Sequence, residues 1–322
     1  MMKKRELLAG LALLPLAKPA LAQEYPNRPI RLLVGFAAGG STDVFARAIA
    51  PRLQALLGQP VVIENRPGAG GNIATEATTR SAPDGYTLLL GTIGPLAINP
   101  TLYGNLSFDP LKDLTPVSLV GEVPNVLAVP VDRPFRSVTD IIAAAKARPE
   151  ALNFGSSGIG SAGHLAAEQL NLMAGIRTTH VPYRGGGALL PELIAGRVDY
   201  AFTTALNGIP QAEAGKLRIL AVPNGKRVPL LPEIPTIAES GLPGFDGVDW
   251  AAMMAPPGLP APILAKLNGA MQSVLKEPEL VAAMAARRLV LEASTPEALA
   301  EFLRQETARW APVVRASGAR PD

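Results

Sequence analysis

The chain has 322 residues, of which 48% are hydrophobic and 18% are charged, with 30 basic, 27 acidic, two histidine and no cysteine residues. This balance excludes a disordered protein, and the length is that of roughly two domains of about 150 residues each. Without cysteine, a disulfide scaffold, a thiol nucleophile and an iron–sulfur cluster are excluded, and two histidines leave little for metal ligation. We therefore expect no metal site.

Residues 1–22 have the pattern of a secretory signal peptide. Basic residues precede an apolar run from Leu7 to Ala17, and the segment closes on Ala20-Leu21-Ala22, the small-x-small pattern of a cleavage site. The apolar run is shorter than the roughly 20 residues of a membrane-spanning helix, so an uncleaved anchor is the minor alternative. We expect cleavage after Ala22 and export, which in a double-membraned cell means the periplasm.

The leader also carries the excess positive charge of the chain. It holds four basic residues and one acidic residue, so the sequence from Gln23 onward has 26 of each kind and no net charge. The basic character of the full sequence therefore belongs to the leader, and it gives no support to binding of nucleic acid or of an anionic membrane surface.

Strand and helix patterns alternate in the first part of the mature chain. Such alternation predicts a parallel sheet with helices on both faces. Ser41 or Thr42 is expected to cap the first helix. The predicted elements are a strand at 30–36, a helix at 41–57, a strand at 61–63, a helix at 72–80 and a strand at 86–91.

Residues 117–129 form an apolar, extended segment that only Pro124 interrupts. This segment is too long for one ordinary strand, so it predicts a crossing into a second domain. Residues 249–255 have the same character and predict the return crossing. Between them we expect helices at 138–147, 162–174 and 188–195 and strands at 152–155, 179–181, 199–202 and 217–222; after the return, helices at 263–275, 278–286 and 296–317.

The two crossings divide the mature chain into two α/β domains, residues 23–124 plus 249–322 and residues 125–248, joined by a hinge of two crossing strands. Ligands of open α/β sheets bind in the crevice outside the carboxyl ends of the strands. The layout is that of a hinged binding protein, whose ligand lies between the two domains.

Two glycine-rich and hydroxyl-rich loops join a predicted strand to a helix N-terminus. An N-terminus offers unpaired N–H donors and about half a positive charge, so it binds a carboxylate or phosphate without lysine or arginine. The alternative is a plain cap in which Ser41 satisfies a helix amide and the glycines only permit the turn. The loops are Ala37-Ala38-Gly39-Gly40-Ser41-Thr42-Asp43 and residues 154–164, Phe-Gly-Ser-Ser-Gly-Ile-Gly-Ser-Ala-Gly-His.

Residues 158–163, Gly-Ile-Gly-Ser-Ala-Gly, formally match the dinucleotide-binding pattern. The acidic residue that this pattern requires about 20 positions later is missing, and an exported protein meets little nicotinamide cofactor, so an NAD(P)-dependent oxidoreductase is disfavoured. Neither a Gly-x-Ser-x-Gly elbow nor a phosphate-binding loop occurs. His164 could serve as a base in an exported enzyme, but a structural role is favoured for it and for His180.

Several short motifs follow one another along the mature chain, among them residues 25–31, 36–43, 64–72, 82–88, 97–100, 152–158, 180–185, 214–218 and 235–241. In these motifs the chain resembles the Bug (TctC-like) receptors, the periplasmic solute-binding components of tripartite tricarboxylate transporters. The resemblance implies a type II periplasmic binding protein fold, no enzymatic activity and no cofactor. It also implies a monomer that closes on a small carboxylated metabolite and delivers it to membrane permease subunits.

The resemblance further implies where the ligand binds. In the family, backbone amides and hydroxyls of the two loops hold the ligand carboxylate, partly through ordered waters. On this chain these positions are Gly39, Gly40, Ser41 and Thr42 on one side and Ser156, Ser157, Gly158 and Ser161 on the other, with Phe36, Thr92 and His164 lining the same crevice. Ala38 and Asp43 belong to the first loop and complete this candidate set.

One position departs from the family. Many members carry an acidic residue after a phenylalanine in a strand of the second domain, whereas here Thr203 follows Phe202. A neutral threonine cannot balance an ammonium group, so we hypothesise an unaminated organic acid as ligand over an amino acid, and Thr203 joins the candidate site.

A transport receptor is the leading functional hypothesis. A ligand sensor that presents its closed form to a membrane signalling kinase needs the same hinged architecture, so the sequence does not separate the two. An exported enzyme is the third hypothesis, and a bound acid that is turned over would support it.

Overall fold

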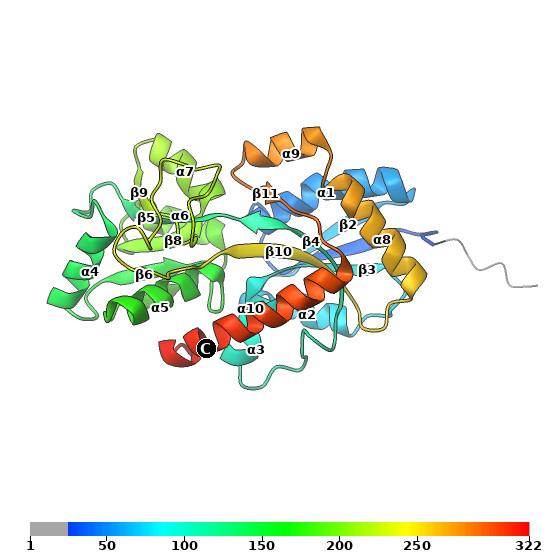
Figure 1. Cartoon of the computed structure of the whole chain (residues 1–322), viewed down its shortest axis with the longest axis horizontal. Coiled ribbons are helices and arrows are strands. Elements are labelled where there is room, and N and C mark those ends of the chain that lie inside the picture. Colours follow the sequence, from blue (N-terminus) through cyan, green and yellow to red (C-terminus); the bar gives the residue numbers. More distant parts are fainter. Residues whose placement is uncertain (1–24, 322) are drawn as a thin grey trace, which may run out of the picture.

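The computed structural model describes residues 25–321, so the predicted signal peptide and its cleavage site lie outside the described residues. Two β-sheets lie end to end along the long axis of the molecule, and helices cover both faces of each sheet (Figure 1). Extended strands run from one sheet to the other through the middle of the molecule. The architecture is therefore the mixed α/β arrangement of two sheets that the sequence predicts.

The first sheet has six strands in the order β11-β4-β10-β3-β1-β2. Their bounds are Ile30–Val34 (β1), Val61–Asn65 (β2), Thr87–Thr92 (β3), Thr115–Val123 (β4), Asp249–Ala255 (β10) and Val290–Leu291 (β11). The second sheet has five strands in the order β7-β6-β8-β5-β9. Their bounds are Asn125–Pro130 (β5), Asn153–Ser156 (β6), Thr179–Pro182 (β7), Tyr200–Thr204 (β8) and Leu217–Ala221 (β9).

Both sheets are mixed, which corrects the expectation of purely parallel sheets. Strands β1, β2 and β3 are parallel, but β10 is antiparallel to both β3 and β4. The second sheet repeats this pattern, since β6 is parallel to β7 and β8 whereas β5 is antiparallel to β8 and β9. The antiparallel strand is in each case the one that arrives from the other sheet, and it enters from the opposite direction.

The helices confirm most of the sequence prediction. On the side of the first sheet they are α1 (Ser41–Leu57), α2 (Asn72–Thr79), α3 (Asn99–Leu102), α8 (Ala261–Val274), α9 (Pro278–Ala285) and α10 (Pro296–Ser317), with short helical turns at Ala69–Gly71 and Gly94–Ile98. Beside the second sheet lie α4 (Val138–Ala147), α5 (Ala162–Ala174), α6 (Gly186–Ile194) and α7 (Ala205–Glu213). The sequence prediction missed α3, α7, β11 and the two turns. In α7, Gly208 and Pro210 interrupt the sequence with residues that disfavour helices.

The two predicted crossings join the sheets. Strand β4 ends at Val123, and Pro124 separates it from β5, which begins at Asn125. Asp249, the first residue of β10, pairs with Val123, so both crossings run side by side. The domain boundaries predicted from the sequence fall at these crossings and stay a prediction.

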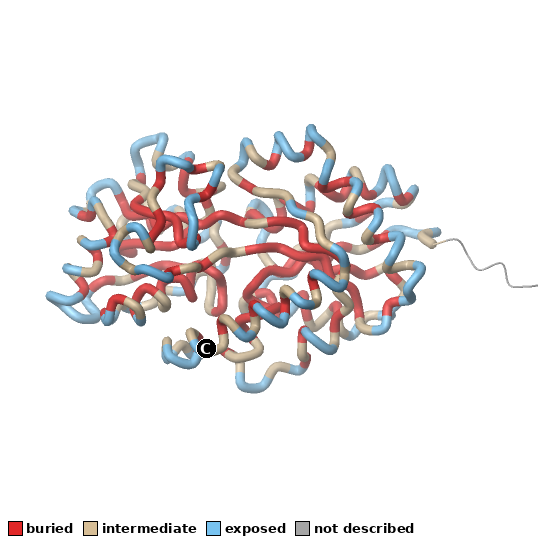
Figure 2. Tube along the Cα trace, in the orientation of Figure 1, coloured by how far each residue is buried: buried red, intermediate tan, exposed pale blue. Residues whose placement is uncertain are grey.

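Apolar side chains fill the space on both faces of each sheet, and the buried segments in Figure 2 follow the strands. One buried contact attaches the last helix to the return crossing. Trp250 of β10 packs edge-on against Phe302 and donates its indole N–H to Glu306 of α10 over 2.8 Å. Trp250 therefore has a packing role on the return crossing.

Glycines allow the backbones of the two halves of the molecule to contact each other. A Cβ atom placed on Gly94, beside the first sheet, would lie 2.7 Å from the carbonyl oxygen of Gly160, which belongs to the loop after β6. A Cβ on Gly160 would lie 2.1 Å from Oδ1 of Asn99. These approaches are closer than any side chain allows, so the contact depends on glycine at both positions.

We expect Gly94→Ala to push these two loops apart and to lower the free energy of unfolding by about 1–3 kcal/mol, the usual cost of overpacking a close contact. Urea denaturation measures the change. Gly104→Ala is the matched control, because a Cβ there meets no atom within 4 Å, and it should change stability by less than about 0.5 kcal/mol. Equal stabilities of the two variants would contradict the proposed contact.

Candidate ligand-binding cavity

A cavity lies between the two sheets, and we call it the central cavity. Its first wall is built from the loop between β1 and α1 and from the end of β3. The residues of this wall are Phe36, Ala37, Ala38, Gly40, Ser41, Thr42 and Thr92.

The opposite wall comes from the second sheet and its helices, and the two crossing strands contribute one residue each. The opposite wall consists of Ser157, Ser161, Ala162, Gly163, Gly185, Gly186, Gly187, Leu189, Phe202, Thr203, Thr204 and Asn207, and the crossings contribute Asn125 and Asp249. The lining therefore combines small residues, hydroxyls and amides with a few apolar side chains.

Four helices begin at the central cavity, namely α1, α5, α6 and α7. The first turn of a helix has N–H groups without intrahelical partners, and its end carries a partial positive charge. Only α5 has a side-chain cap, in which Ser161 Oγ accepts a hydrogen bond from the amide of His164 over 3.3 Å. The N-cap residues of the other three, Gly40, Gly185 and Thr204, make no side-chain cap hydrogen bond.

The cap of α1 corrects the sequence prediction. We expected Ser41 or Thr42 to cap this helix, but the N-cap is Gly40, and both hydroxyl residues lie in the first turn and line the cavity. A glycine cap leaves the first amides of the helix without a side-chain acceptor. The positive end of α1 is therefore available to a ligand.

Asp43 holds the loop in front of α1 in place. Its buried carboxylate accepts hydrogen bonds from the amide of Gly39 over 2.9 Å, from Nε of Arg47 over 2.8 Å and from Nδ2 of Asn65 over 3.0 Å. Asn65 also donates to the carbonyl of Phe36. Burial opposes ionisation of Asp43, yet these donors keep the pKa of its carboxyl below the ordinary value. The loop is thus fixed by a charged group that does not line the cavity.

Within residues 25–321, no lysine, arginine or histidine lines the central cavity, and Asp249 is the only ionisable side chain there. The hydroxyl of Thr204 is buried and has no hydrogen-bond partner in this described part of the chain. A buried hydroxyl without a partner is costly, so it favours a ligand oxygen or nitrogen at this position. The cavity can hold an anion with backbone amides and hydroxyls in place of a cation.

Residues 45–319 match the family described as the tripartite tricarboxylate transporter family receptor, TctC. The chain is also 40% identical to Protein BugT of Bordetella pertussis over 306 residues, which cover 95% of this chain and 94% of that protein. The chain belongs to this family of periplasmic solute-binding receptors.

Solved structures agree with the family assignment. The receptor superposes on R. palustris Rpa4515 with adipate with a TM-score of 0.88 at 38% identity, covering 93% of this chain and 100% of that one. It superposes on MatC (Rpa3494) from Rhodopseudomonas palustris with bound malate with a TM-score of 0.85 at 34% identity, covering 90% and 100%. The type II periplasmic binding protein fold predicted from the sequence is therefore confirmed.

The structure brings most of the predicted site residues together. Nine of them line the central cavity of the receptor: Phe36, Ala38, Gly40, Ser41, Thr42, Thr92, Ser157, Ser161 and Thr203. They come from both walls, so the two loops face each other as the sequence predicts. Their roles in binding stay a proposal.

Five predicted residues lie outside this lining, namely Gly39, Asp43, Ser156, Gly158 and His164. Gly39 and Asp43 shape the first loop, Ser156 and His164 hold the second loop, and Gly158 lines an adjoining cavity. Gly39 donates its amide to Asp43 and has a positive φ of 87°, so it shapes the turn. The buried Ser156 hydroxyl donates to the carbonyl of Gly158 over 3.0 Å and accepts from its amide over 3.1 Å.

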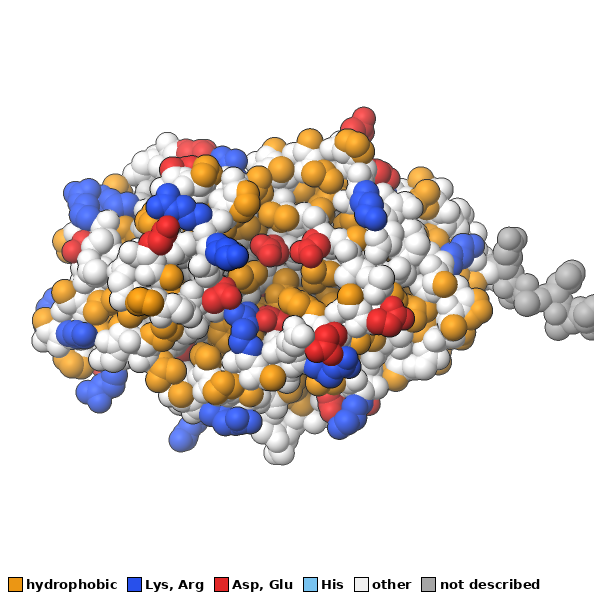
Figure 3. All heavy atoms as spheres, viewed as in Figure 1, with side chains coloured by type: hydrophobic (Ala, Val, Ile, Leu, Met, Phe, Trp, Pro, Cys, Tyr) orange, Lys and Arg blue, Asp and Glu red, His pale blue; other side chains and the backbone are white. Residues whose placement is uncertain are grey.

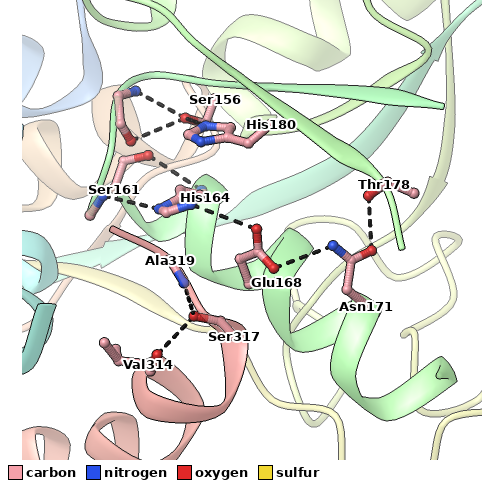
Figure 4. A network of polar contacts seen from close by, with 12 residues as sticks. Ser156, Ser161, His164, Glu168, Asn171, Thr178, His180, Val314, Ser317 and Ala319 are labelled. Atoms are coloured by element: carbon pink, nitrogen blue, oxygen red, sulfur yellow. Dashed lines mark hydrogen bonds and ion pairs between the residues drawn. The ribbon is translucent and has the colours of Figure 1, made fainter. Parts of the chain in front are cut away.

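A stacked pair of histidines, the buried His164 and the half-buried His180, supports the second wall (Figure 4). The rings of His164 and His180 stack with centroids 4.0 Å apart. Nδ1 of His164 accepts the amide of Gly160 over 3.1 Å, and Nε2 of His180 hydrogen-bonds Ser156 Oγ over 2.7 Å. The structural interpretation of both histidines is thereby supported, and no histidine nitrogen reaches the cavity lining.

Sequence reasoning missed several lining residues. Gly185, Gly186 and Gly187 follow a strand and begin a helix, which is the same signal that marked the first two loops. Asn125 and Asp249 gave a weaker signal, since Asn125 is a polar residue inside one apolar crossing segment and Asp249 is a polar residue at the start of the other. Asn207 lies in α7, the helix that was not predicted.

Asp249 also corrects an argument made from the sequence. The hypothesis of an unaminated ligand rests on the neutral Thr203, which cannot balance a ligand ammonium group, and Thr203 does line the cavity. Asp249 supplies a carboxyl from the return crossing instead. The choice between an amino acid and an unaminated acid therefore depends on the state of Asp249.

The face that carries β10 and α10 has acidic and basic side chains interspersed and is hollowed near its centre (Figure 3). A hollow behind the crossings is lined by Glu122, Asp246, Glu292, Glu306 and Arg309 around apolar side chains that include Trp250. Residues 25–321 contain no group of three or more potential metal ligands that could hold an ion. Across the same residues, no helix is both long and apolar enough to pass through a bilayer.

The histidine pair should make the receptor less stable in acid. Burial lowers the pKa of His164 to about 3, and His180 adds to this effect; burial also lowers the pKa of His180 to about 4. The unfolded state therefore binds protons below about pH 6.5 that the folded state does not, and stability falls as the pH is lowered toward 4. We expect the pair to reduce the free energy of unfolding by about 3–4 kcal/mol between pH 7 and pH 5, about 2 kcal/mol for each ring.

Urea denaturation at both pH values measures this loss, and a His164→Gln, His180→Gln double variant should show a smaller one. Glutamine offers an acceptor and a donor in the same region without titrating. In the unmodified receptor, the imidazole NMR signals should not titrate between pH 7 and about pH 5. Histidine signals that titrate near pH 6.5 would contradict this account.

Proposed function

We propose that the receptor captures a small unaminated carboxylate in the central cavity and delivers it to the permease subunits of a tripartite transporter. The observation that carries the proposal is the convergence of four helix N-termini on a cavity that no basic side chain between residues 25 and 321 lines. Relatives solved with adipate and with malate support a carboxylate ligand for this chain. An anion is the ligand for which such a cavity is suited.

A ligand that reaches both walls would use donors from both. Ser41 and Thr42, with the first amides of α1, face the ligand from one side. Ser157 and Ser161, with the first amides of α5, face it from the other. Hydroxyl and amide donors discriminate poorly between carboxylates of different length, so the distance between the walls would set the preferred acid.

Ligand binding would favour the closed form by its differential affinity, because only the closed form presents both sets of donors at once. The glycine contact between Gly94 and Gly160 supports this mechanism, since it lets the two halves approach without side chains between them. The crossing strands would act as the hinge.

The remaining parts of the proposal follow from the family. We infer that the leader is removed after Ala22, that the receptor acts in the periplasm as a monomer, and that it binds its ligand without chemical turnover. Permease subunits are the proposed partner; co-purification with a membrane kinase instead would support a sensor, and turnover of a bound acid that is lost in a His164→Ala variant would support an enzyme.

The first test is a melting-temperature scan of the chain from Gln23 onward against aliphatic dicarboxylates from succinate to adipate, malate, citrate, aromatic acids, aspartate and glutamate. A ligand at a hundredfold excess over its Kd stabilises the native state by about 2.7 kcal/mol, which raises the melting temperature by several degrees. We expect the largest rise with an unaminated acid. A larger rise with aspartate or glutamate would overturn the unaminated ligand, and no rise with any acid after unfolding and refolding would overturn the carboxylate.

Substitution of Ser157 tests the second wall. A Ser157→Leu variant should weaken binding of the best acid from the scan at least tenfold, because the larger side chain fills space that the ligand needs. Ser157→Ala removes only the hydroxyl and should cost about 1 kcal/mol of binding free energy. Calorimetric titration measures both. Unchanged affinity in both variants, with melting temperatures of the free proteins also unchanged, would remove this loop from the site.

A further inference from the structure

Asp249 occupies a particular place in the central cavity. It is the first residue of β10, where the return crossing enters the first sheet, and it pairs with Val123 just before the other crossing. Its side chain and that of Asn125 line the cavity from the two crossing strands. A group on the hinge strands lies between the two walls and faces a ligand that either wall holds.

The carboxyl of Asp249 is held by neutral donors. Oδ1 accepts the backbone amide of Trp250 over 2.8 Å, and the side chain of Asn125 also hydrogen-bonds the carboxyl. Among residues 25–321, no basic side chain forms an ion pair with Asp249. The carboxyl therefore has no counter-ion, and it shares a cavity that otherwise favours anions.

The charged groups on neighbouring elements face elsewhere. Successive residues of a strand point to opposite faces, so Trp250 and its partner Glu122 on β4 open on the hollow behind the crossings, as do Glu306 and Arg309 of α10. On the walls, Asp43 and Arg47 of α1 pair with each other, and His164 of α5 stacks on His180 behind the lining. None of these groups lines the central cavity.

Burial raises the pKa of Asp249 to about 7, although the hydrogen bonds from Trp250 and Asn125 act in the opposite direction. An anionic ligand in the same cavity adds a like charge close to this carboxyl. A like charge disfavours ionisation, so ligand binding raises the pKa further.

We propose that Asp249 is protonated in the liganded receptor and donates its O–H to a carboxylate oxygen of the ligand, so that binding takes up one proton from solution. The inference rests on the proposed function and deepens it, because it assigns to Asp249 the selection of an unaminated acid. A protonated carboxyl is a donor to an anion, as a ligand carboxylate requires, and it carries no charge to balance an ammonium group.

The sign of the pH dependence follows from this assignment. Above about pH 7 Asp249 of the empty receptor is ionised, so binding must first protonate it, and affinity falls about tenfold for each pH unit. Below about pH 6 the group is already protonated and affinity becomes flat. An ionised Asp249 that bound a ligand ammonium group would give the opposite slope.

The experiment is isothermal titration of the receptor at about pH 8 with adipate or whichever dicarboxylate gives the largest rise in the melting scan. Buffers with different ionisation enthalpies report the number of protons taken up, because the observed heat varies linearly with the buffer enthalpy. We expect close to one proton per ligand for the unmodified receptor and close to none for Asp249→Asn. The affinity of that variant should be nearly independent of pH between about 7 and 9, since asparagine is a neutral donor of similar size.

Glu122→Gln is the matched control. Burial also raises the pKa of Glu122, but this carboxyl opens on the hollow behind the crossings, so its loss should leave the proton uptake unchanged. Asp249→Ser provides a second neutral variant should the asparagine variant fail to fold. Binding without proton uptake, or affinity that rises with pH, would overturn the role of Asp249 and leave the receptor function intact. Failure of every carboxylate to bind would instead overturn the proposed function itself.

Discussion

The proposed binding of a carboxylate depends on one electrostatic constraint. No basic side chain of the described residues lines the central cavity, so the positive potential that an anion needs must come from another source. Four helix ends supply it, and three of them leave their first amides without a side-chain acceptor. Glycine at the caps of α1 and α6 has two consequences. It withholds the competing acceptor that serine or aspartate would supply, and it lets the backbone approach a ligand closely.

Fixing these loops requires charge that stays away from the ligand. Asp43 is the example, because its carboxylate binds Gly39, Arg47 and Asn65 and so orients the loop before α1 without lining the cavity. On the other wall the neutral pair His164 and His180 has the same role through the backbone of the loop. Both supports form hydrogen bonds within the protein, which hold the loops in place while other hydroxyls and amides line the cavity.

How much the sequence could predict depends on whether a feature is local. The bounds of α1, α4, α5 and α10 follow from apolar periodicity and from the residues that begin and end helices, and they were predicted to the residue. The sequence also predicts that the two glycine-rich loops face each other, because parallel strands place their carboxyl ends at one edge of a sheet. The exchange of one strand between the sheets is not local. Residues 117–129 predict a crossing, but only pairing shows that the crossing strand is antiparallel to its new neighbours.

The same distinction explains why only part of the predicted site lines the central cavity. A motif identifies a loop but does not separate residues that face the ligand from residues that hold the loop, so Ser156 and His164 were grouped with Ser157 and Ser161. That division depends on which side chains find partners inside the protein. Ser156 does so through Gly158 and His180, and it lies outside the cavity lining.

Asp43 and Asp249 show how far environment decides the chemistry of one residue type. Both lie near the central cavity, but donors that include an arginine keep the pKa of Asp43 low, whereas Asp249 has neutral donors and its burial moves its pKa toward neutrality. A carboxyl that must support a wall benefits from a permanent charge, because charge-assisted hydrogen bonds are the stronger ones. A carboxyl that must face an anion benefits from losing its charge, and a position on the hinge strands, in a cavity that no basic side chain of the described residues lines, allows that.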